Sequence, residues 1–507
     1  MSSIRYCLVL FGLVILFGVG SAASPPVANF TANITSGVAP LSVRFTDLSL
    51  NNSSGWAWFF GDETYTEEWT QVNTGAGWTA RQSHSSVAMA DGMTIVLMGG
   101  SDGGNKNDTW QSTDNGVAWK RVNSSSGWSA RYGHSSVVMP DGGIVLMGGW
   151  GAGNKNDTWQ STDSGKTWKQ VNASSGWSAR QSHSSVAMAD GSIVLMGGYY
   201  GGSISKNDTW QSTDNGKTWK QVNASSGWSA RYSHSSVAMA DGSIVLMGGF
   251  SGSPKNDTWR STNNGKTWTQ VNASSGWSAR YMHNSVVMPD GSIVLMGGRS
   301  GVTYFNATWR STDKGATWTQ LPNAEWSARD AISSVVMRDG GIVMMGGYDT
   351  SSGQKNDTWR FRPAGSPLKN PGHIYTMPGI YTVALQAFNA GGYNSTRKAG
   401  YITVTNPMVN KIGVFRNSTH IFYLDYNGNG VWNGASIDRQ YNFGISGDKP
   451  ITGDWNSDVK TEFGVFRNST HLFYLDYNGN GVWNGAVDDR SYNFGITGDK
   501  PITGTWS

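Results

Sequence analysis

The sequence is poor in cysteine, in charge and in long apolar runs, and each shortage excludes a class of protein. Its one cysteine among 507 residues is Cys7, so the chain beyond residue 23 can form no disulfide and offers no thiolate. Charged residues make up only 14%, the net charge is +4 and no basic block stands out, which excludes the electrostatic pattern of nucleic-acid binding. After residue 23 no stretch is apolar enough to span a bilayer, so we expect no transmembrane anchor in the mature chain.

The first 23 residues have the pattern of a secretory signal peptide. Arg5 precedes an apolar run over Cys7–Val19, and small residues follow up to Ala23. We therefore expect cleavage near Ala23 and a location outside the cell, either secreted or at the cell surface. Asn-Asp-Thr sequons recur later, and either reading of them, as glycan acceptors or as turn signals, stays open.

What the sequence has in abundance is glycine (67) and tryptophan (25), and most of both lie in one repeated stretch from Trp69 to Arg362. One tryptophan leads each of six similar units, at intervals of 50, 49, 51, 49 and 49 residues: Trp78, Trp128, Trp177, Trp228, Trp277 and Trp326. A fixed period near fifty residues with four strand-like segments per unit is typical of β-propeller blades.

Counting the segments predicts how the propeller closes. The first three (His-Ser-Ser-Val-Ala-Met, Ile-Val-Leu-Met ended by Gly-Gly, and Asp-Thr-Trp) occur six times, but the fourth (Thr-Trp-Lys-Gln-Val) follows only five units. The missing copy is Trp69–Val72, which stands before the first unit. An N-terminal strand that completes the last blade closes the ring and removes its edges, so we predict six blades.

The repeats resemble two families. Ala-Arg-x-x-His-Ser, a later Gly-Gly and Asn-Asp-Thr-Trp are similar to kelch repeats. Ser161-x-Asp163-x-Gly165-x-Thr167-Trp168 resembles the Asp-box of sialidases and related propellers, and two other units match it fully. Both resemblances imply a propeller.

The segments on either side of the repeats resemble the two halves of a polycystic kidney disease (PKD) domain, a small β-sandwich. The first half carries Pro-Leu-Ser-Val-Arg-Phe and Trp-Phe-Phe-Gly-Asp, and the second runs from Asn370 to Thr405. We therefore predict an all-β chain with a six-bladed propeller inserted into a PKD-like sandwich, plus a small C-terminal β-repeat module. The predicted parts are a signal peptide (1–23), sandwich first half (24–66), propeller (67–362), sandwich second half (363–406) and two repeats (407–507).

The C-terminal repeats begin at Gly413 and Gly464 and resemble FG-GAP or integrin-α-like repeats, whose family binds calcium. Alternating oxygen side chains in a tight loop can converge on a hard cation, and three loops have that spacing, although one has Val459 where the family has glycine. Calcium is the only cofactor we expect. The predicted ligands are Asp454, Asn456, Asp458 and Glu462 in one loop, Asp425, Asn427 and Asn429 in the second, and Asp476, Asn478 and Asn480 in the third. For the second and third loops an Asn-Gly hairpin turn is the alternative interpretation.

The predicted ligand-binding residues lie where the copies differ. Strand alternation places the Gly-Gly loops and the Ala-Arg loops on one face of the propeller, and the residue that follows each pair varies within a constant frame. Aromatic side chains dominate these positions and suit sugar rings or protein surfaces. The predicted set is Trp150, Tyr199, Phe250, Arg299 and Tyr348 after Gly-Gly, with Tyr132, Tyr232 and Tyr281 after Ala-Arg. The arginine and histidine that recur in five or six units are interpreted as links between blades, because catalysis needs a residue once.

Three functions stay open. The favoured one is adhesion to, or recognition of, an extracellular glycan or surface protein. The second is a sialidase-like glycoside hydrolase, for which Arg299, Tyr281, Glu325 and Asp330 lie in loops of the same face, but no paired carboxylates stand out and we name no catalytic residue. The third is a purely structural envelope component. The domain combination resembles surface proteins of methanogenic archaea.

Overall fold

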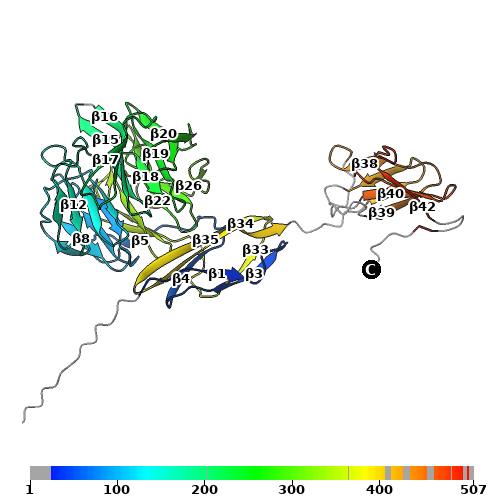
Figure 1. The fold of residues 1–507 in the computed structure, drawn as a ribbon, viewed down its shortest axis with the longest axis horizontal. Helices are drawn as coiled ribbons and strands as arrows, with labels where there is room; N and C mark the ends of the chain where they lie inside the picture. The colour runs from blue at the N-terminus through cyan, green and yellow to red at the C-terminus, as the bar shows by residue number, and fades with distance from the viewer. Residues whose placement is uncertain are drawn as a thin grey trace, which may run out of the picture. The chain divides into compact units, whose positions relative to one another are not determined.

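The computed structural model describes residues 24–202, 204–363, 365–405, 413–425, 434–453, 462–480, 482–494 and 500–501. All regular structure within these ranges is β, as the sequence predicted (Figure 1). The described part of the chain contains no helix long and apolar enough to cross a membrane. The chain divides into two compact units, residues 1–405 and residues 406–507.

Six four-stranded antiparallel sheets form the blades of a propeller. The innermost strands contact one another around a ring: β6 (Ser85–Ala88), β10 (Ser135–Val138), β14 (Ser184–Ala187), β18 (Ser235–Ala238), β22 (Asn284–Val287) and β28 (Ser333–Val336). The second strands are β7 (Ile95–Met98), β11 (Ile144–Met147), β15 (Ile193–Gly201), β19 (Ile244–Phe250), β23 (Ile293–Met296) and β29 (Ile342–Met345). The third strands are β8 (Thr109–Ser112), β12 (Thr158–Ser161), β16 (Ile204–Ser212), β20 (Pro254–Ser261), β26 (Thr308–Ser311) and β32 (Thr358–Phe361).

The outer strand of the sixth blade comes from the N-terminal side of the repeats. Five outer strands follow their own blades: β9 (Lys120–Asn123), β13 (Lys169–Asn172), β17 (Lys220–Asn223), β21 (Thr269–Asn272) and β27 (Thr319–Gln320). In the sixth, β5 (Thr70–Asn73) pairs with β32, with Trp359 opposite Gln71. The propeller therefore has six blades and is closed by its first strand, which confirms the predicted fold class.

The second strands are apolar on both faces because every blade is covered on both sides by its neighbours. Val96 and Met98 of blade 1 pack with Ile144 and Leu146 of blade 2 around Trp128, and all five side chains are buried. Hydroxyl contacts join the inner strands in addition, such as Ser136 Oγ donating to Ser85 Oγ at 2.9 Å. Such contacts link all six neighbouring pairs of inner strands around the ring.

The prediction that Gly-Gly ends the second strand was wrong in blades 3 and 4. There β15 and β19 continue through the glycines to Gly201 and Phe250. The register shifts between Met196 and Gly198, so a bulge absorbs the left-handed backbone of Gly197 (φ 57°) and lets the strand resume. In blades 5 and 6 short hairpins stand in the same place, formed by β24 (Arg299–Ser300) with β25 (Thr303–Tyr304) and by β30 (Tyr348–Asp349) with β31 (Gly353–Gln354).

The segments before and after the propeller form one two-sheet sandwich. One sheet contains β1 (Phe30–Ala32), β3 (Leu41–Asp47) and β33 (Gly372–Tyr375), and the other contains β2 (Ser36–Val38), β35 (Gly392–Thr405), β34 (Gly379–Asn389) and β4 (Gly55–Phe59). Both segments supply the core, in which Trp58 packs on Phe30 and Phe45 while its Nε1 donates to the Leu368 carbonyl at 2.9 Å. Neither half could bury these rings without the other.

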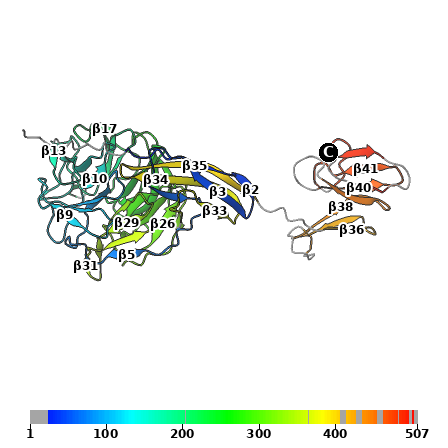
Figure 2. The same cartoon turned by 90° about the horizontal axis from the view of Figure 1, so that it is seen from below.

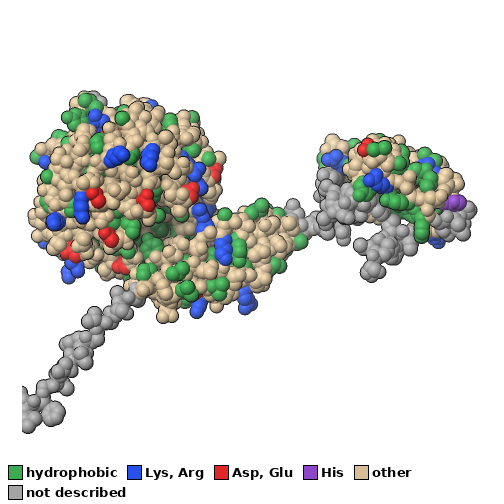
Figure 3. All heavy atoms as spheres, viewed as in Figure 1, with side chains coloured by type: hydrophobic (Ala, Val, Ile, Leu, Met, Phe, Trp, Pro, Cys, Tyr) green, Lys and Arg blue, Asp and Glu red, His purple; other side chains and the backbone are tan. Residues whose placement is uncertain are grey.

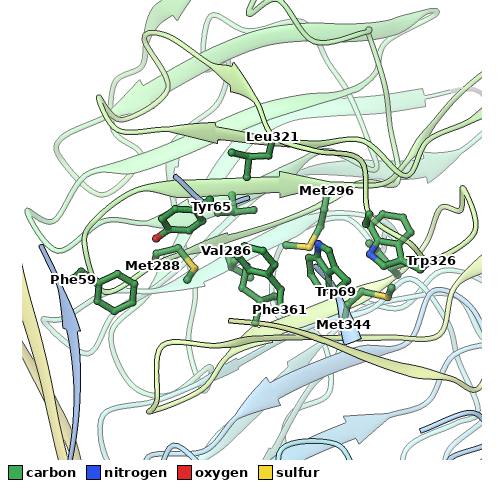
Figure 4. Close-up of a cluster of buried hydrophobic side chains, with 14 of the residues drawn as sticks. Phe59, Tyr65, Trp69, Val286, Met288, Met296, Leu321, Trp326, Met344 and Phe361 are labelled. Atoms are coloured by element: carbon green, nitrogen blue, oxygen red, sulfur yellow. The ribbon is translucent and has the colours of Figure 1, made fainter. Parts of the chain in front are cut away.

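The sandwich packs against the Asp-Gly turns of the propeller, with β34 and β35 alongside it in both views (Figures 1 and 2). Gln386 of β34 donates to the carbonyls of Met337 and Arg338, and Phe59 of β4 lies against Gly340. A buried cluster runs from Phe59 through Tyr65 to Trp69 and Trp326, so the two parts share a core (Figure 4). The face that carries the Gly-Gly loops lies at the opposite ends of the same strands.

The C-terminal unit contains two small sheets. One is formed by β36 (Gly413–Arg416), β37 (Ile421–Leu424) and β38 (Arg439–Asn442). The other is formed by β39 (Lys449–Gly453), β40 (Glu462–Arg467), β41 (Leu472–Leu475) and β42 (Arg490–Asn493). Phe422 of the first stacks on Phe463 of the second, with ring centroids 4.8 Å apart, so the two repeats share one core.

Candidate functional site

Each blade brings its two variable loop residues together on the face that carries the Gly-Gly loops. In blade 2 the Tyr132 amide donates to the Trp150 carbonyl at 3.0 Å, and the Trp150 amide donates back to the Tyr132 carbonyl at 2.8 Å. The same antiparallel bridge occurs in every blade, so the loops form a ring of six pairs. These pairs are Gln82 with Ser101, Tyr132 with Trp150, Gln181 with Tyr199, Tyr232 with Phe250, Tyr281 with Arg299 and Asp330 with Tyr348.

Side chains from blades 3, 4 and 5 form a continuous row of rings on this face. Tyr199 contacts Tyr232 across the blade boundary with ring centroids 5.2 Å apart, and Tyr232 contacts Phe250 at 5.4 Å. Phe250 then contacts Tyr281 of blade 5 at 5.2 Å, edge to face. We call Tyr199, Tyr232, Phe250 and Tyr281 the aromatic arc. The arc joins residues that are 82 positions apart in sequence (199 to 281) into one row of rings, in which Tyr199, Tyr232 and Phe250 are half-buried and Tyr281 is buried.

An arginine continues the arc into blade 6. The Arg299 guanidinium lies over the Tyr281 ring, 5.0 Å from its centroid, and Nη1 donates to the Tyr304 hydroxyl at 3.0 Å. Its Nε is 3.0 Å from Asp330 Oδ2. Tyr304 in turn contacts Tyr348, with ring centroids 6.0 Å apart. Tyr304 was not predicted, although its loop departs from the repeat and could have indicated that the position is special.

The Arg299–Asp330 pair is unevenly exposed. The arginine side chain is 30% exposed and the aspartate side chain only 3%. Burial raises the pKa of Asp330 to about 6, and the neighbouring Arg299 charge opposes that rise. A molecule that approaches this face therefore meets the guanidinium and not the carboxylate.

Only three of the four residues considered for a hydrolase lie together: Arg299, Tyr281 and Asp330. The fourth, Glu325, accepts a hydrogen bond from the Trp69 amide at 2.8 Å, on the side of the sixth blade's outer strand. Trp150, the most exposed of the predicted aromatic residues at 36%, lies in blade 2 beside Tyr132. Trp150 thus lies on the predicted face, but its role in binding stays a prediction, as does that of the aromatic arc.

All six repeated arginines are buried, and five of them hold a carboxylate of their own blade. Arg131 donates through Nη1 and Nη2 to Asp157 at 2.6 and 2.9 Å, while its backbone amide donates to Lys106 of the preceding blade. Four other blades repeat the bidentate pair: Arg81 with Asp108, Arg180 with Asp208, Arg231 with Asp257 and Arg329 with Asp357. These arginines are scaffold that ties each blade internally and to its neighbour.

The chain matches two family models, both over the repeats. Residues 53–249 match a model described as the KLHDC2/KLHL20/DRC7 Kelch-repeats domain. Residues 225–364 match a model described as the DUF6242 beta propeller domain. The propeller is therefore similar to kelch-repeat proteins, and kelch propellers indicate a protein-binding role. No curated protein matches the chain.

The two matches together span the aromatic arc, Arg299 and Tyr348, whereas residues 365–507 lie outside both. The resemblances of the sandwich to PKD domains and of the C-terminal unit to FG-GAP repeats thus rest on the sequence motifs alone. The surface in Figure 3 carries scattered charges of both signs on the propeller, without one dominant charged patch in that view.

The predicted calcium ligands are only partly within the described residues. Asp454, Asn456, Asp458, Asn427 and Asn429 lie outside them. In the third loop Asp476 Oδ1 and Asn478 Oδ1 both accept from the Asn480 amide, at 3.1 and 3.0 Å, as in a turn. Glu462 and Asp425 are buried. Within the described ranges no three His, Cys, Asp or Glu side chains are grouped to hold a metal ion, and calcium stays a prediction.

Proposed function

We propose that this chain is an extracellular or cell-surface binding protein whose propeller captures a partner protein on the face that carries the aromatic arc. The observation that carries the proposal is the contact of four rings from three consecutive blades at positions where the repeat varies. The blades are otherwise nearly identical, so a row of contacting rings in blades 3 to 5, continued by Arg299 towards blade 6, distinguishes one side of the ring.

The geometry of the arc favours protein over carbohydrate as the ligand. Neighbouring rings are tilted by 58°, 44° and 69°, which gives a ridged apolar surface in place of a flat platform for a sugar ring. Such a surface suits the side chains of a partner protein, where buried aromatic residues supply much of the binding energy. Arg299 at the end of the arc adds a cation that would pair with an acidic or carbonyl group of the partner.

The test is capture by the full secreted chain on an array of extracellular proteins and glycans. Replacing Tyr232 and Phe250 together by alanine should weaken capture about tenfold or more, because these rings lie at the middle of the arc. Arg299→Ala should weaken it by less, and Arg299→Lys should recover part of the loss. Val117→Ala, an exposed apolar change in an Asp-box turn on the opposite face, is the matched control and should bind normally.

Other outcomes identify the other functions. Capture of glycans only, with loss in Trp150→Ala, would favour the carbohydrate reading, since Trp150 offers one exposed ring. Release of the fluorophore from a fluorogenic sialoside would favour a hydrolase. Unchanged capture by the Tyr232 and Phe250 variant would contradict the proposed face, and no capture by any form would leave the structural envelope role.

A further inference from the structure

Blade 5 lacks the carboxylate that pairs with the buried arginine in each of the other blades. In five blades an aspartate two positions before the third-strand tryptophan accepts two bonds from the arginine and one from the indole. In blade 4, for example, Asp257 accepts from Arg231 at 2.6 and 2.8 Å and from Trp259 Nε1 at 2.8 Å. In blade 5 the residue at that position is Ala307.

Blade 5 keeps the arginine and tryptophan donors that face this position, but it lacks the aspartate that accepts from them. Arg280 is 1% exposed, and its Nε and Nη1 donate to the carbonyls of Ser278 and Gly297 as in the other blades. Within the part of the chain that the structure describes, no carboxylate lies within ion-pair distance of Arg280. Trp309 Nε1 is buried and has no hydrogen-bond partner, whereas the other five third-strand indoles donate to their aspartates at 2.8 Å.

The Arg280 charge is only partly compensated. Phe305 occupies the place of the lysine found in the other blades, and its ring centroid is 4.2 Å from the guanidinium carbon. A ring stacked on the face of a guanidinium attracts the charge but accepts no in-plane N–H bond. Burial lowers the pKa of Arg280 to about 10, which still leaves it charged at neutral pH. A buried cation without a carboxylate is costly, so an anion that supplies one is favoured.

We propose that blade 5 binds a small free carboxylate anion, of the size of formate or acetate, between Arg280 and Trp309. The five other blades serve as internal precedents, because each holds a carboxylate on the same two donors. The aspartate side chains at this position are 11–14% exposed, so the corresponding place in blade 5 can be reached from solvent. Ala307 is itself partly exposed. Because alanine has no carboxylate, the bound anion would take the place of the aspartate carboxylate found in the other blades.

The experiment compares the melting temperature of the full chain in sodium formate and in sodium chloride at equal ionic strength. We expect formate to raise the melting temperature by about 1–3 °C over chloride, because a ligand that binds only the folded state stabilises it. Ala307→Asp supplies the carboxylate covalently, and it should melt higher in chloride and lose the response to formate. Line broadening of ¹³C-formate, present with the parent chain and absent with Ala307→Asp, reports the binding directly.

Blade 4 provides the matched control. Asp257→Ala creates the same set of donors beside Arg231 and should melt lower than the parent in chloride, with a larger recovery in formate. Equal melting of the parent in formate and chloride, or an equal formate response in Ala307→Asp, would overturn the proposal. If raising the chloride concentration lifted the melting temperature as much as raising the formate concentration, the site would not select a carboxylate and the proposal would fail. None of these outcomes depends on capture at the aromatic arc.

Discussion

At the scale of single residues, the five repeated histidines show how a polar side chain can serve as packing. Each lies against the Gly-Gly turn of the preceding blade, and a Cβ added to Gly148 would be only 2.9 Å from His183 Cε1. In the sixth unit Ile332 stands in the same place, against Gly297. An isoleucine can replace the imidazole there, so the position requires its volume and not its basicity. Burial lowers the pKa of these histidines to about 3.

These histidines should make the fold sensitive to acid. Because the pKa of each is lower in the folded chain than its unfolded value near 6.5, the unfolded chain binds protons first as the pH falls. Each histidine then costs about 1.4 kcal/mol of stability per pH unit between 6.5 and its folded pKa. We expect His183→Ile to change the melting temperature little at pH 7.5 and to raise it relative to the parent at pH 5.

The control for this prediction has the opposite sign. The pKa of Asp330 is raised to about 6, so the unfolded chain loses its proton first, and the contribution of Asp330 to stability falls as the pH rises from about 4 to 6. Asp330→Asn should therefore gain stability relative to the parent as the pH rises through that window. Parallel pH profiles for the parent and His183→Ile would contradict the packing interpretation.

At the scale of elements, the strand that closes the ring reproduces the contacts of the strands that it replaces. Trp69, just before β5, contacts Trp326 edge to face with ring centroids 6.1 Å apart, as Trp119 contacts Trp78 at 6.1 Å in blade 1. Trp69 also packs on Phe361 and lies in the core shared with the sandwich. The closing strand is thus anchored on both sides, whereas an ordinary outer strand belongs to the propeller alone.

We expect Trp69→Ala to cost about 3–5 kcal/mol, the usual loss for a buried tryptophan, and to cost more than Trp119→Ala in a complete blade. The partly buried Trp119 loses less area, and no second domain depends on it. Urea unfolding of both variants, followed by tryptophan fluorescence, measures the difference. A smaller loss for Trp69→Ala would show that β5 is not what holds the sixth blade closed.

Elements that repeat were predictable from sequence, and contacts made by departures from the repeat were not. The count of fourth-strand copies identified Trp69 as the missing one, because a strand without a blade must close another. Nothing in the sequence placed Tyr304 against Arg299, since that contact depends on a hairpin in an irregular loop. The Ala307 difference is visible in the sequence, but its meaning requires knowing that the aspartate at this position in the other blades bonds both the buried arginine and the third-strand tryptophan.

At the scale of the whole molecule, the propeller and the sandwich belong to one compact unit. Asp290 of blade 5 accepts from the hydroxyl of Tyr65, in the segment that leads from the sandwich into the ring, at 2.9 Å, and from Arg310 of its own blade at 2.7 Å. Tyr65 also stacks on Phe361, at the end of the last propeller strand, with ring centroids 5.9 Å apart, so both crossings between propeller and sandwich lie in one core. The Gly-Gly face stays clear of the sandwich, which packs at the other ends of the strands.

The C-terminal unit has its own core, so its response to calcium can be followed separately from that of the propeller. If Asp454, Asp476 and their neighbours bind calcium, the ion will stabilise the folded repeats, and their melting transition in the full chain should rise in millimolar calcium relative to chelator. The propeller transition should stay constant. Asp454→Ala and Asp476→Ala should each reduce the rise, whereas Asp163→Ala in an Asp-box should leave it unchanged. Identical calorimetric traces with calcium and with chelator would mean that these loops are held by their own turns, as the Asn480 amide already is in the third loop.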